Sequence, residues 1–438
     1  MPAMPWPPKK ALSLTLTFNH MAIATPTLIG PFTQLLPMQG LPVKGPLADG
    51  QLPVLTNAGI ITQAGKVVAT GPFEALQAQA KQQGAQTQYI DQLMVALPGF
   101  IDSHTHICYA GSRAADYALR NSGTSYIDIA KKGGGIRDTM RKTRGATQAQ
   151  LANGIVQRCK RLLNDGVCTI EVKSGYGLSL ASELKMLRAI NQANAQVPAR
   201  LISTCLAAHT LPPEYDNETQ YLQHLLDVLL PQVMQEQLSQ RVDIFIEESA
   251  FSVQAARHYL TEAQRLGFDL TVHADQFSTG GAALAVALGA VSADHLEASG
   301  PKEVALLAAS KTVATALPGA TLGLGCPFTP ARRLLDAGGA LAIASDWNPG
   351  SAPMGNLLVQ ACLLGTFEKL SNAEVLAGIT CRAAAALGMH DRGTLAPGQL
   401  ADFTAFATTD YREITYNQGS LRPSATWVGG KLYNPGLM

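Results

Sequence analysis

Residues 97–107 read Leu97-Pro-Gly-Phe-Ile-Asp-Ser-His-Thr-His-Ile107, an apolar run that ends in two histidines. The apolar part predicts a buried β-strand at about 99–105, with His104 and His106 at its end. Side chains two residues apart point to the same side of a strand, so the two imidazoles can converge on one metal ion. Such a pair can also consist of ordinary buried histidines. The residues at the ends of the other strands have to decide between a metal site and a purely structural pair.

Seven further apolar runs follow this strand, and helical segments separate them. The runs lie at about 167–173, 200–207, 242–248, 270–275, 289–295, 311–317 and 340–346. Segments between them, among them 148–164, 180–195, 253–266 and 302–310, carry apolar residues at spacings of three and four, as helices that pack on a sheet require. This alternation predicts an α/β fold, a TIM-like (β/α)8 barrel that spans residues 96–390.

Both chain ends have short β-runs and turn residues instead. Residues 59–71 predict a hairpin around a Gln-Ala-Gly turn, and residues 393–403 and 425–433 have the same short-strand character. We therefore expect a small β-sandwich domain that residues 1–95 and 391–438 build together. The first 12 or so residues are expected to be disordered, and residues 1–40 have no clear counterpart in the resemblance described below.

The amino-acid composition indicates which classes of partner this chain is expected to bind. Lys and Arg total 33 against 32 Asp and Glu, so nothing suggests a nucleic-acid or membrane-surface partner, and a small-molecule substrate is favoured. No window approaches about 18 uninterrupted apolar residues, which makes a membrane-spanning helix unexpected. The seven cysteines are scattered without C-x-x-C spacing, which fits reduced thiols in a cytoplasmic protein. A homodimer would be ordinary for such a barrel.

Polar residues recur where the predicted strands end. The fifth strand ends in Thr271-Val-His-Ala-Asp-Gln276, the sixth in Ala293-Asp-His295 and the eighth in Ala344-Ser-Asp346. In a (β/α)8 barrel all carboxyl strand ends meet at one mouth, where the active site lies. We therefore predict one divalent metal ion, Zn or Fe, with four ligands. These ligands are His104, His106, His273 and Asp346.

A metal at this mouth would supply hydroxide near neutral pH by lowering the pKa of a bound water. Asp346 is predicted to accept the water's proton and to deliver it to a leaving nitrogen. His295 is predicted to support the developing oxyanion. The pattern indicates a metal-dependent hydrolase.

These residues resemble the signature of the amidohydrolase superfamily, and more narrowly that of the imidazolonepropionase family. The segments that carry the narrower resemblance are 103–113, 171–177, 208–210, 273–276 and 345–351. The resemblance implies hydrolytic opening of 4-imidazolone-5-propanoate to N-formimidoyl-L-glutamate, a step of histidine degradation. It also implies a set of residues that line the substrate pocket, with the arginine clamping the substrate carboxylate. This set is Arg113, Tyr176, His209, Gln276, Asn348, Gly350 and Ser351.

Some positions depart from related enzymes. Many deaminases of the superfamily carry Glu where this chain has Gln276, and a neutral amide cannot act as general acid or base. We therefore place Gln276 in the catalytic set, beside Asp346 and His295, as a residue that orients the substrate. Lys173 falls on the second strand and is not placed to bridge two metals. Glu247 or Glu248, after the fourth strand, could bind a second ion, although the resemblance implies one.

Two other functions remain open from the sequence. One is a different amidohydrolase, a cyclic amidase or a heterocycle deaminase, with the same metal site and another pocket. The other is a catalytically inactive amidohydrolase-like scaffold that binds or assembles. The complete set of four predicted ligands argues against the inactive scaffold.

Overall fold

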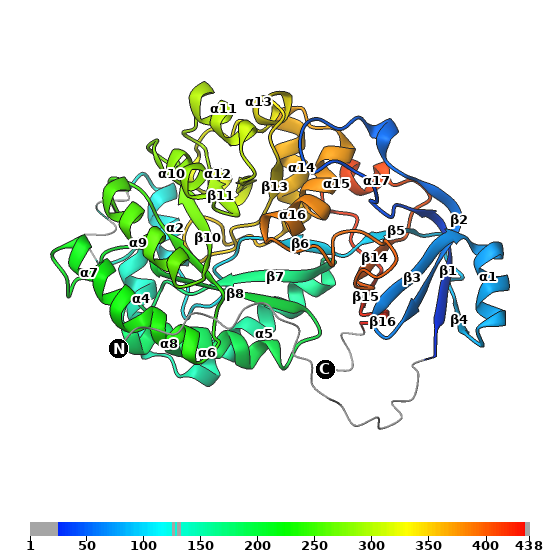
Figure 1. The fold of residues 1–438 in the computed structure, drawn as a ribbon, viewed down its shortest axis with the longest axis horizontal. Helices are drawn as coiled ribbons and strands as arrows, with labels where there is room; N and C mark the ends of the chain where they lie inside the picture. Colours follow the sequence, from blue (N-terminus) through cyan, green and yellow to red (C-terminus); the bar gives the residue numbers. More distant parts are fainter. Residues whose placement is uncertain (1–24, 125–127, 129–132, 434–438) are drawn as a thin grey trace.

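A computed structural model describes residues 25–124, 128 and 133–433. The chain forms a barrel with helices around it and a smaller sheet domain beside it, made from both chain ends (Figure 1). The expected disorder of the first 12 residues lies outside the described residues. No helix within the described ranges combines the length and the apolarity needed to cross a membrane.

The barrel sheet has eight parallel strands, one for each predicted run. They are β6 (Phe100–Asp102), β7 (Val167–Lys173), β8 (Arg200–Ala208), β9 (Arg241–Ile244), β10 (Asp269–Ala274), β11 (Ser292–His295), β12 (Val313–Ala316) and β13 (Leu341–Ile343). Each strand pairs with the next along the chain, in the order β13-β12-β11-β10-β9-β8-β7-β6. The predicted barrel is confirmed, and strands β6, β9 and β13 are shorter than their predicted runs because those runs continue past the strand ends toward the mouth.

The two end strands of this sheet meet at the mouth. Asp346 donates its backbone N–H to the carbonyl of His104 at 3.0 Å, and His106 donates to the carbonyl of Trp347 at 3.0 Å. The chain segments that carry predicted metal ligands thus also close the barrel. Their backbone is fixed by hydrogen bonds at the place where the side chains have to act.

Helices cover the outside of the barrel and flank both domains. They are α1 (Phe73–Gln82), α2 (Ala114–Asn121), α4 (Ile136–Gly145), α5 (Gln148–Asn164), α6 (Leu180–Asn194), α7 (Glu218–His224), α8 (Leu230–Gln235), α9 (Val253–Arg265), α10 (Gly281–Leu288), α11 (Pro301–Ala309), α12 (Pro318–Leu324), α13 (Ala331–Asp336), α14 (Leu357–Glu368), α15 (Asn372–Gly378), α16 (Cys381–Ala386) and α17 (Arg412–Tyr416). A 3-10 turn, η1 (Asp49–Gln51), and a π-helical turn, η2 (Leu225–Leu229), complete the set.

Helix α5 illustrates why these segments are helical. Thr147 caps its first turn by accepting from the backbone N–H of Gln150, and the Gln150 side chain reaches back to the Thr147 backbone. Leu151, Ile155 and Leu162 recur at helical spacing and are buried against the sheet. The cap and the apolar stripe together give the bounds that the sequence predicts.

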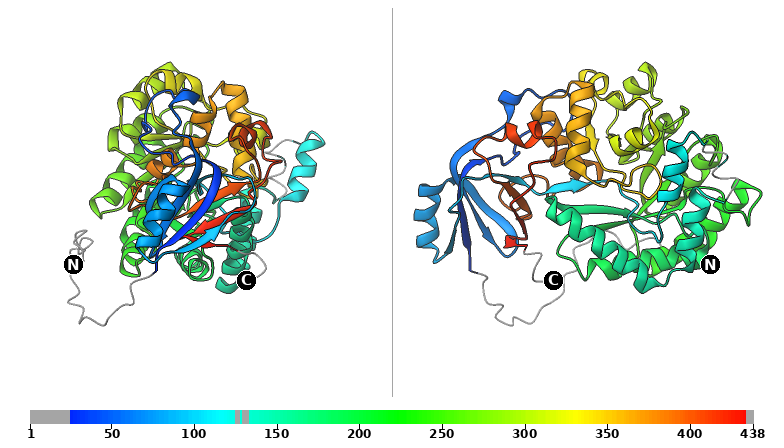
Figure 2. Two further views of the ribbon diagram at one scale, coloured as in Figure 1. Left: turned by 90° about the vertical axis from the view of Figure 1, so that its right-hand side faces the viewer. Right: turned by 180° about the vertical axis from the view of Figure 1, so that it is seen from behind.

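The chain ends form a second sheet, mixed and also of eight strands. Its strands are β1 (Thr27–Leu35), β2 (Leu55–Gln63), β3 (Lys66–Pro72), β4 (Gln86–Tyr89), β5 (Val95–Pro98), β14 (Phe403–Phe406), β15 (Ala425–Val428) and β16 (Lys431–Leu432). The order is β16-β15-β14-β5-β1-β2-β3, and β4 also pairs with β1. The predicted hairpin is β2 and β3, and both chain ends join in this one sheet at the side of the barrel (Figure 2).

Three aromatic rings pack together within the apolar core of the second sheet. Phe32 meets Phe403 and Trp427 edge-on, with ring centroids 6.2 and 6.1 Å away, and these two rings stack on each other at 4.6 Å. The chain passes from this sheet into the barrel at Gly99, between β5 and β6. A Cβ there would lie 2.4 Å from the sulfur of Cys168, so only glycine fits this close crossing between the two domains.

Candidate metal centre and substrate pocket

Three imidazoles converge at the barrel mouth. His104 and His106 directly follow β6, and His273 lies in β10. Their Nε2 atoms are close together: 3.2 Å separates His104 from His106, and 3.2 Å separates His106 from His273. All three side chains are buried. Among the described residues, these are the three side chains that could hold a metal ion together.

Asp346 completes the group from the segment after β13. Its Oδ1 lies 3.3 Å from Nε2 of His106 and 3.7 Å from Nε2 of His104. This oxygen is buried and has no hydrogen-bond partner, while Oδ2 accepts from Nδ2 of Asn348 at 2.9 Å. A buried carboxylate oxygen without a donor is costly, and a cation beside it would remove that cost.

The tautomers of two imidazoles are set from behind by carboxylates. Nδ1 of His104 lies 2.7 Å from Oδ2 of Asp294, and Nδ1 of His273 lies 2.9 Å from Oδ2 of Asp243. A carboxylate accepts the proton of the nitrogen that it faces, which leaves Nε2 as a lone pair. Lone pairs and a carboxylate oxygen that face one point repel each other unless a cation lies between them. The donor set therefore fits a divalent metal that accepts nitrogen and oxygen, such as zinc or iron.

The pKa shifts of the three imidazoles favour their neutral form, which is the form that binds a metal ion. Burial lowers the pKa of His104 and His106 well below the usual range, and it lowers the pKa of His273 to about 4 despite the Asp243 carboxylate. Burial also raises the pKa of Asp346 to about 7. A cation at the site would favour the ionised form of that carboxylate.

His106 is held in a different way from the other two predicted ligands. No carboxylate of the described residues lies within ion-pair distance of its buried Nδ1. Its ring stacks on that of His209, with centroids 5.2 Å apart and planes at 21°. Tyr176 lies against both rings, with centroids 6.0 Å from His106 and 5.4 Å from His209. The structure thus brings Tyr176 and His209, both expected in the pocket, next to a predicted ligand.

His295 lies beside the three histidines rather than among them. Its ring centroid is 5.3 Å from that of His273, and its Nδ1 faces Oε1 of Glu297 at 3.4 Å. Burial works against protonation of His295, but the Glu297 carboxylate outweighs it and raises the pKa of this imidazole. An imidazole in this state is a hydrogen-bond donor toward the mouth, which suits the oxyanion role that the sequence predicts.

The loop after Asp346 connects this predicted ligand to Arg113. Asn348 accepts the backbone N–H groups of Gly350 and Ser351 at 2.7 and 2.8 Å, while its own amide donates to Asp346. A Cβ on Gly350 would lie 2.6 Å from Nη1 of Arg113, so the absence of a side chain makes room for the guanidinium. All four pocket residues expected here therefore lie together with the predicted ligand.

Gln276 is half-buried just after β10, next to a loop that Glu247 holds. Glu247 accepts the backbone N–H groups of Phe277 and Ser278 at 2.8 and 3.2 Å, and it also accepts from the Ser278 hydroxyl. Glu248 is exposed. The oxygens of Glu247 are thus committed to the loop, which argues against the second metal ion that the sequence left open.

Sequence reasoning missed the buried charges that support the site. Glu171 and Lys173 in β7, Asp243 in β9 and Asp294 in β11 are all buried inside the barrel. Glu183 in α6 is buried beneath the loop that carries Tyr176. The signal was present, because charged residues interrupt strands that otherwise read as apolar runs, and a buried charge needs a partner.

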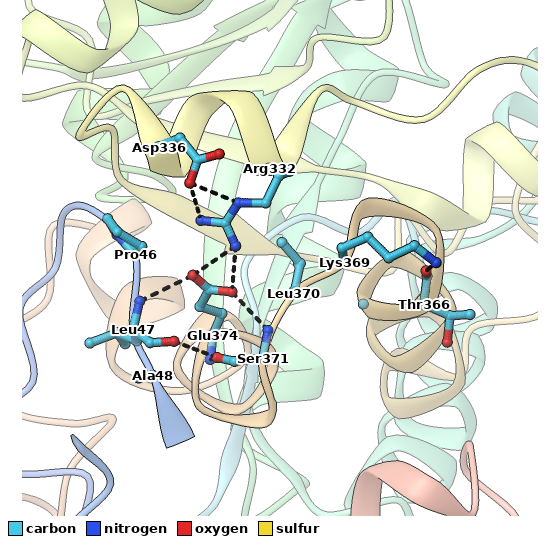
Figure 3. A pocket seen from close by; sticks show the side chains of 11 residues that line it. Pro46, Leu47, Ala48, Arg332, Asp336, Thr366, Lys369, Leu370, Ser371 and Glu374 are labelled. Atoms are coloured by element: carbon cyan, nitrogen blue, oxygen red, sulfur yellow. Dashed lines mark hydrogen bonds and ion pairs between the residues drawn. The ribbon is translucent and has the colours of Figure 1, made fainter. Parts of the chain in front are cut away.

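A separate depression on the outer surface does not carry a site. It has a volume of about 710 Å³ and is lined in part by the groups in Figure 3. Arg332 pairs with Asp336 at 2.8 Å and with Glu374 at 2.9 Å, and Glu374 also accepts the backbone N–H groups of Leu47 and Ser371. These charged groups are engaged with one another and with backbone N–H groups, and they fasten the segment before β2 to α15.

Comparison with known proteins agrees with this geometry. The model of the Amidohydrolase family matches residues 95–433. Curated imidazolonepropionases from Deinococcus deserti and Bdellovibrio bacteriovorus are 42% and 38% identical to this chain. The first match covers 87% of this chain and 93% of the relative, and the second covers 94% and 97%.

Solved structures share the fold at low identity. An atrazine chlorohydrolase mutant from Arthrobacter aurescens, complexed with zinc and atraton, has a TM-score of 0.65 at 18% identity and covers 93% of this chain and 94% of its own. An adenosine deaminase from Xanthomonas campestris with bound zinc has a TM-score of 0.67 at 17% identity, over 93% and 92% of the two chains. These neighbours establish the barrel architecture.

Proposed function

The chain belongs to the imidazolonepropionase family of amidohydrolases, and from that premise we propose that it hydrolyses 4-imidazolone-5-propanoate to N-formimidoyl-L-glutamate in histidine breakdown. One observation carries the proposal. The unpartnered Oδ1 of Asp346 faces the converging histidines, and the loop after Asp346 lies against Arg113. A site for hydrolysis and a cation for a substrate carboxylate thus share one loop.

The reaction adds water across the lactam C–N bond. The carbonyl carbon gains the hydroxyl oxygen, and the ring nitrogen leaves with a proton. A divalent metal, when bound, would polarise the carbonyl and acidify the water. Asp346 takes the proton from the water and returns it to the leaving nitrogen, because no described protein donor occupies its Oδ1. His295 donates toward the carbonyl oxygen as negative charge develops on it.

The pocket residues bind and orient the substrate. Arg113 keeps guanidinium N–H groups free for the propanoate carboxylate after its Nε pairs with Asp116 at 3.1 Å. Gly350, Asn348 and Ser351 shape the wall beside it. Tyr176 and His209 contact the flat ring, and Gln276 orients it by hydrogen bonding. The amide of Gln276 favours ring opening over deamination, since it cannot shuttle a proton.

One zinc or iron ion per chain completes the proposal. His104, His106, His273 and Asp346 would hold it, and Glu247 is occupied elsewhere. The free thiols of all seven cysteines, five of them buried, suit a reducing cytoplasm.

A spectrophotometric assay tests the proposal. Imidazolone propanoate is generated in situ and offered to the metal-loaded protein, with guanine, cytosine and a dihydropyrimidine as parallel substrates. We expect the imidazolone absorbance to fall only with enzyme present, and no turnover of the other three. Turnover of one of these compounds without turnover of imidazolone propanoate would assign the chain to another cyclic amidase or a deaminase. No turnover of any compound, together with no stoichiometric metal, would indicate an inactive scaffold.

A further inference from the structure

A buried ammonium lies behind the converging histidines. Lys173, at the end of β7, is 1% exposed, and its Nζ lies 2.8 Å from Glu171 and 2.8 Å from Asp243. Asp294 is the third carboxylate around it, at 3.9 Å. The three carboxylates come from three different strands, and within the described part of the chain Lys173 is the one lysine or arginine at ion-pair distance from all three.

Two of these carboxylates are the groups that face the metal-ligating imidazoles. The same Oδ2 atom of Asp243 that approaches Lys173 lies 2.9 Å from Nδ1 of His273. The same Oδ2 atom of Asp294 lies 2.7 Å from Nδ1 of His104. Each imidazole is therefore connected to Lys173 through a single carboxylate oxygen.

The third carboxylate reaches the remaining part of the His-x-His segment through the backbone. Glu171 accepts from the backbone N–H of Thr105 at 3.2 Å, and the backbone N–H of Lys173 donates to the carbonyl of Thr105 at 2.9 Å. Thr105 is the residue between His104 and His106. Lys173 and Glu171 thus also hold the backbone of the segment from His104 to His106, which follows β6.

The charges of this cluster depend on one another. Burial alone would lower the pKa of Lys173, but Asp243 and Glu171 outweigh it and raise that pKa. Without the ammonium, three buried carboxylates would lose the cation that they share and would repel one another, so they would move from their present positions.

We propose that Lys173 is a positioning residue for the metal centre: it holds the carboxylates of Asp243 and Asp294 in place against Nδ1 of His273 and His104, so that both imidazoles are oriented with Nε2 toward the predicted metal position. A carboxylate that moves away from its Nδ1 would no longer select the Nδ1–H tautomer, and the two imidazoles would bind metal more weakly. This inference rests on the metal centre of the proposed function, but it concerns metal affinity and not the substrate.

Zinc affinity, measured by competition with a chromophoric chelator on folded protein, tests the role of Lys173. Lys173→Met removes the ammonium and keeps an apolar chain of similar length. Lys185→Met is the matched control, because the Lys185 ammonium binds the backbone carbonyls of Thr143, Arg144 and Ala146 away from the metal centre. We expect Lys173→Met to weaken zinc binding by about 10- to 100-fold, and the control to leave it within twofold.

A second variant covers the case in which the single substitution prevents folding. Lys173→Met combined with Glu171→Gln removes one cation and one carboxylate together, and the Gln oxygen can still accept from Thr105. We expect the double variant to fold and to bind zinc more weakly than the wild type, because Asp243 and Asp294 still lack their cation. Wild-type zinc affinity in a folded Lys173→Met or double variant would overturn the inference.

The tautomers give a readout that requires no metal. In metal-free protein labelled with ¹⁵N-histidine, His104 and His273 are expected as Nδ1–H tautomers, and this preference should weaken in the Lys173 variants. Unchanged tautomers in those variants would also overturn the inference. Wild-type protein that binds no metal would instead contradict the proposed function, so the two failures are distinguishable.

Discussion

The two eight-stranded sheets of this protein bury different kinds of side chain. The sheet at the chain ends encloses aromatic rings, with Phe32, Phe403 and Trp427 in mutual contact. The barrel encloses charge near its mouth, where Lys173 and its carboxylates lie behind three histidines. An aromatic interior stabilises by burial alone, whereas a charged interior is costly unless every group has a partner. The barrel, which buries these charged groups, is also the sheet that carries the candidate active site.

This difference predicts a separation of effects. Changes in the barrel interior should alter metal binding and turnover more than stability, and changes in the second sheet should do the reverse. Four substitutions test the separation, and they follow in order of their expected effect on turnover.

The largest effect is expected from a predicted metal ligand. His273→Ala removes one of three converging nitrogens and leaves the Asp243 carboxylate without its imidazole. Metal content by mass spectrometry should fall far below one per chain, and kcat/KM should fall by at least about 10³-fold, equivalent to about 4 kcal/mol of transition-state stabilisation. His258→Ala is the control, because that histidine is exposed on α9 and its Nε2 lies 3.3 Å from the Gln223 side chain, outside the predicted ligand set. Full metal occupancy in His273→Ala would remove His273 from the ligand set.

Arg113→Met should affect substrate binding and leave the metal in place. Loss of two charge-assisted hydrogen bonds to the substrate carboxylate, at about 1.5 kcal/mol each, corresponds to an increase in KM of about 100-fold. Metal content should match the wild type, because Arg113 contacts Gly350 and Asp116 and none of the ligands. Arg257→Met, on the exposed surface of α9, is the matched control. A KM within twofold of the wild type would mean that another group binds the carboxylate.

A smaller effect is expected from Glu183→Gln, behind the pocket. Glu183 accepts the backbone N–H groups of Gly175, Gly177 and Leu178 at 3.0, 2.7 and 2.7 Å and thereby shapes the loop of Tyr176. The Gln amide turns an NH₂ group toward these donors, so at least one of them loses its acceptor.

We expect KM to rise about tenfold in Glu183→Gln, while metal content and kcat stay close to the wild type, because about 1.5 kcal/mol of loop order is lost. Glu236→Gln, at a partly exposed ion pair with Arg188, serves as the control. A drop in metal content would indicate instead that Glu183 supports the ligands through His209, whose Nδ1 lies 3.0 Å from the carbonyl of Gly175.

The fold could be predicted from the sequence because apolar runs encode it directly. Helix α5 begins and ends where the sequence predicts, since the Thr147 cap and the apolar stripe are both local features. Strand β9 ends at Ile244, before the end of its run at 242–248, because Phe245 and Ile246 form only isolated bridges, to His273 and to Phe251, in place of a regular ladder. The pattern of apolar residues does not encode where a strand becomes a loop in a barrel.

The site could be predicted only as far as strand ends identify it. His104, His106, His273 and Asp346 share the mouth because parallel strands end there, a consequence of topology. Lys173 was recognised from the sequence only as unsuited to bridge two metals. Its partners Glu171, Asp243 and Asp294 lie on three strands, and their shared contact depends on side-chain geometry that no spacing in the sequence expresses.

The smallest effect on turnover is expected from Phe32→Ala in the second sheet. Phe32 is fully buried against Phe403 and Trp427, so its truncation should lower the free energy of unfolding by about 3–5 kcal/mol through lost burial and a new cavity. Urea unfolding measures this loss, and Phe32→Leu, which keeps most of the volume, should cost less.

All proposed site residues lie between β5 and β14 in the chain, and the second sheet contributes none of them. Metal content, KM and kcat of the folded Phe32→Ala protein should therefore stay within twofold of the wild type. The two sheets contact each other through groups such as Arg200, which pairs with Asp402 at 3.1 Å. A marked loss of metal in Phe32→Ala would mean that such contacts transmit strain into the barrel. The interiors of the two sheets would then not be independent.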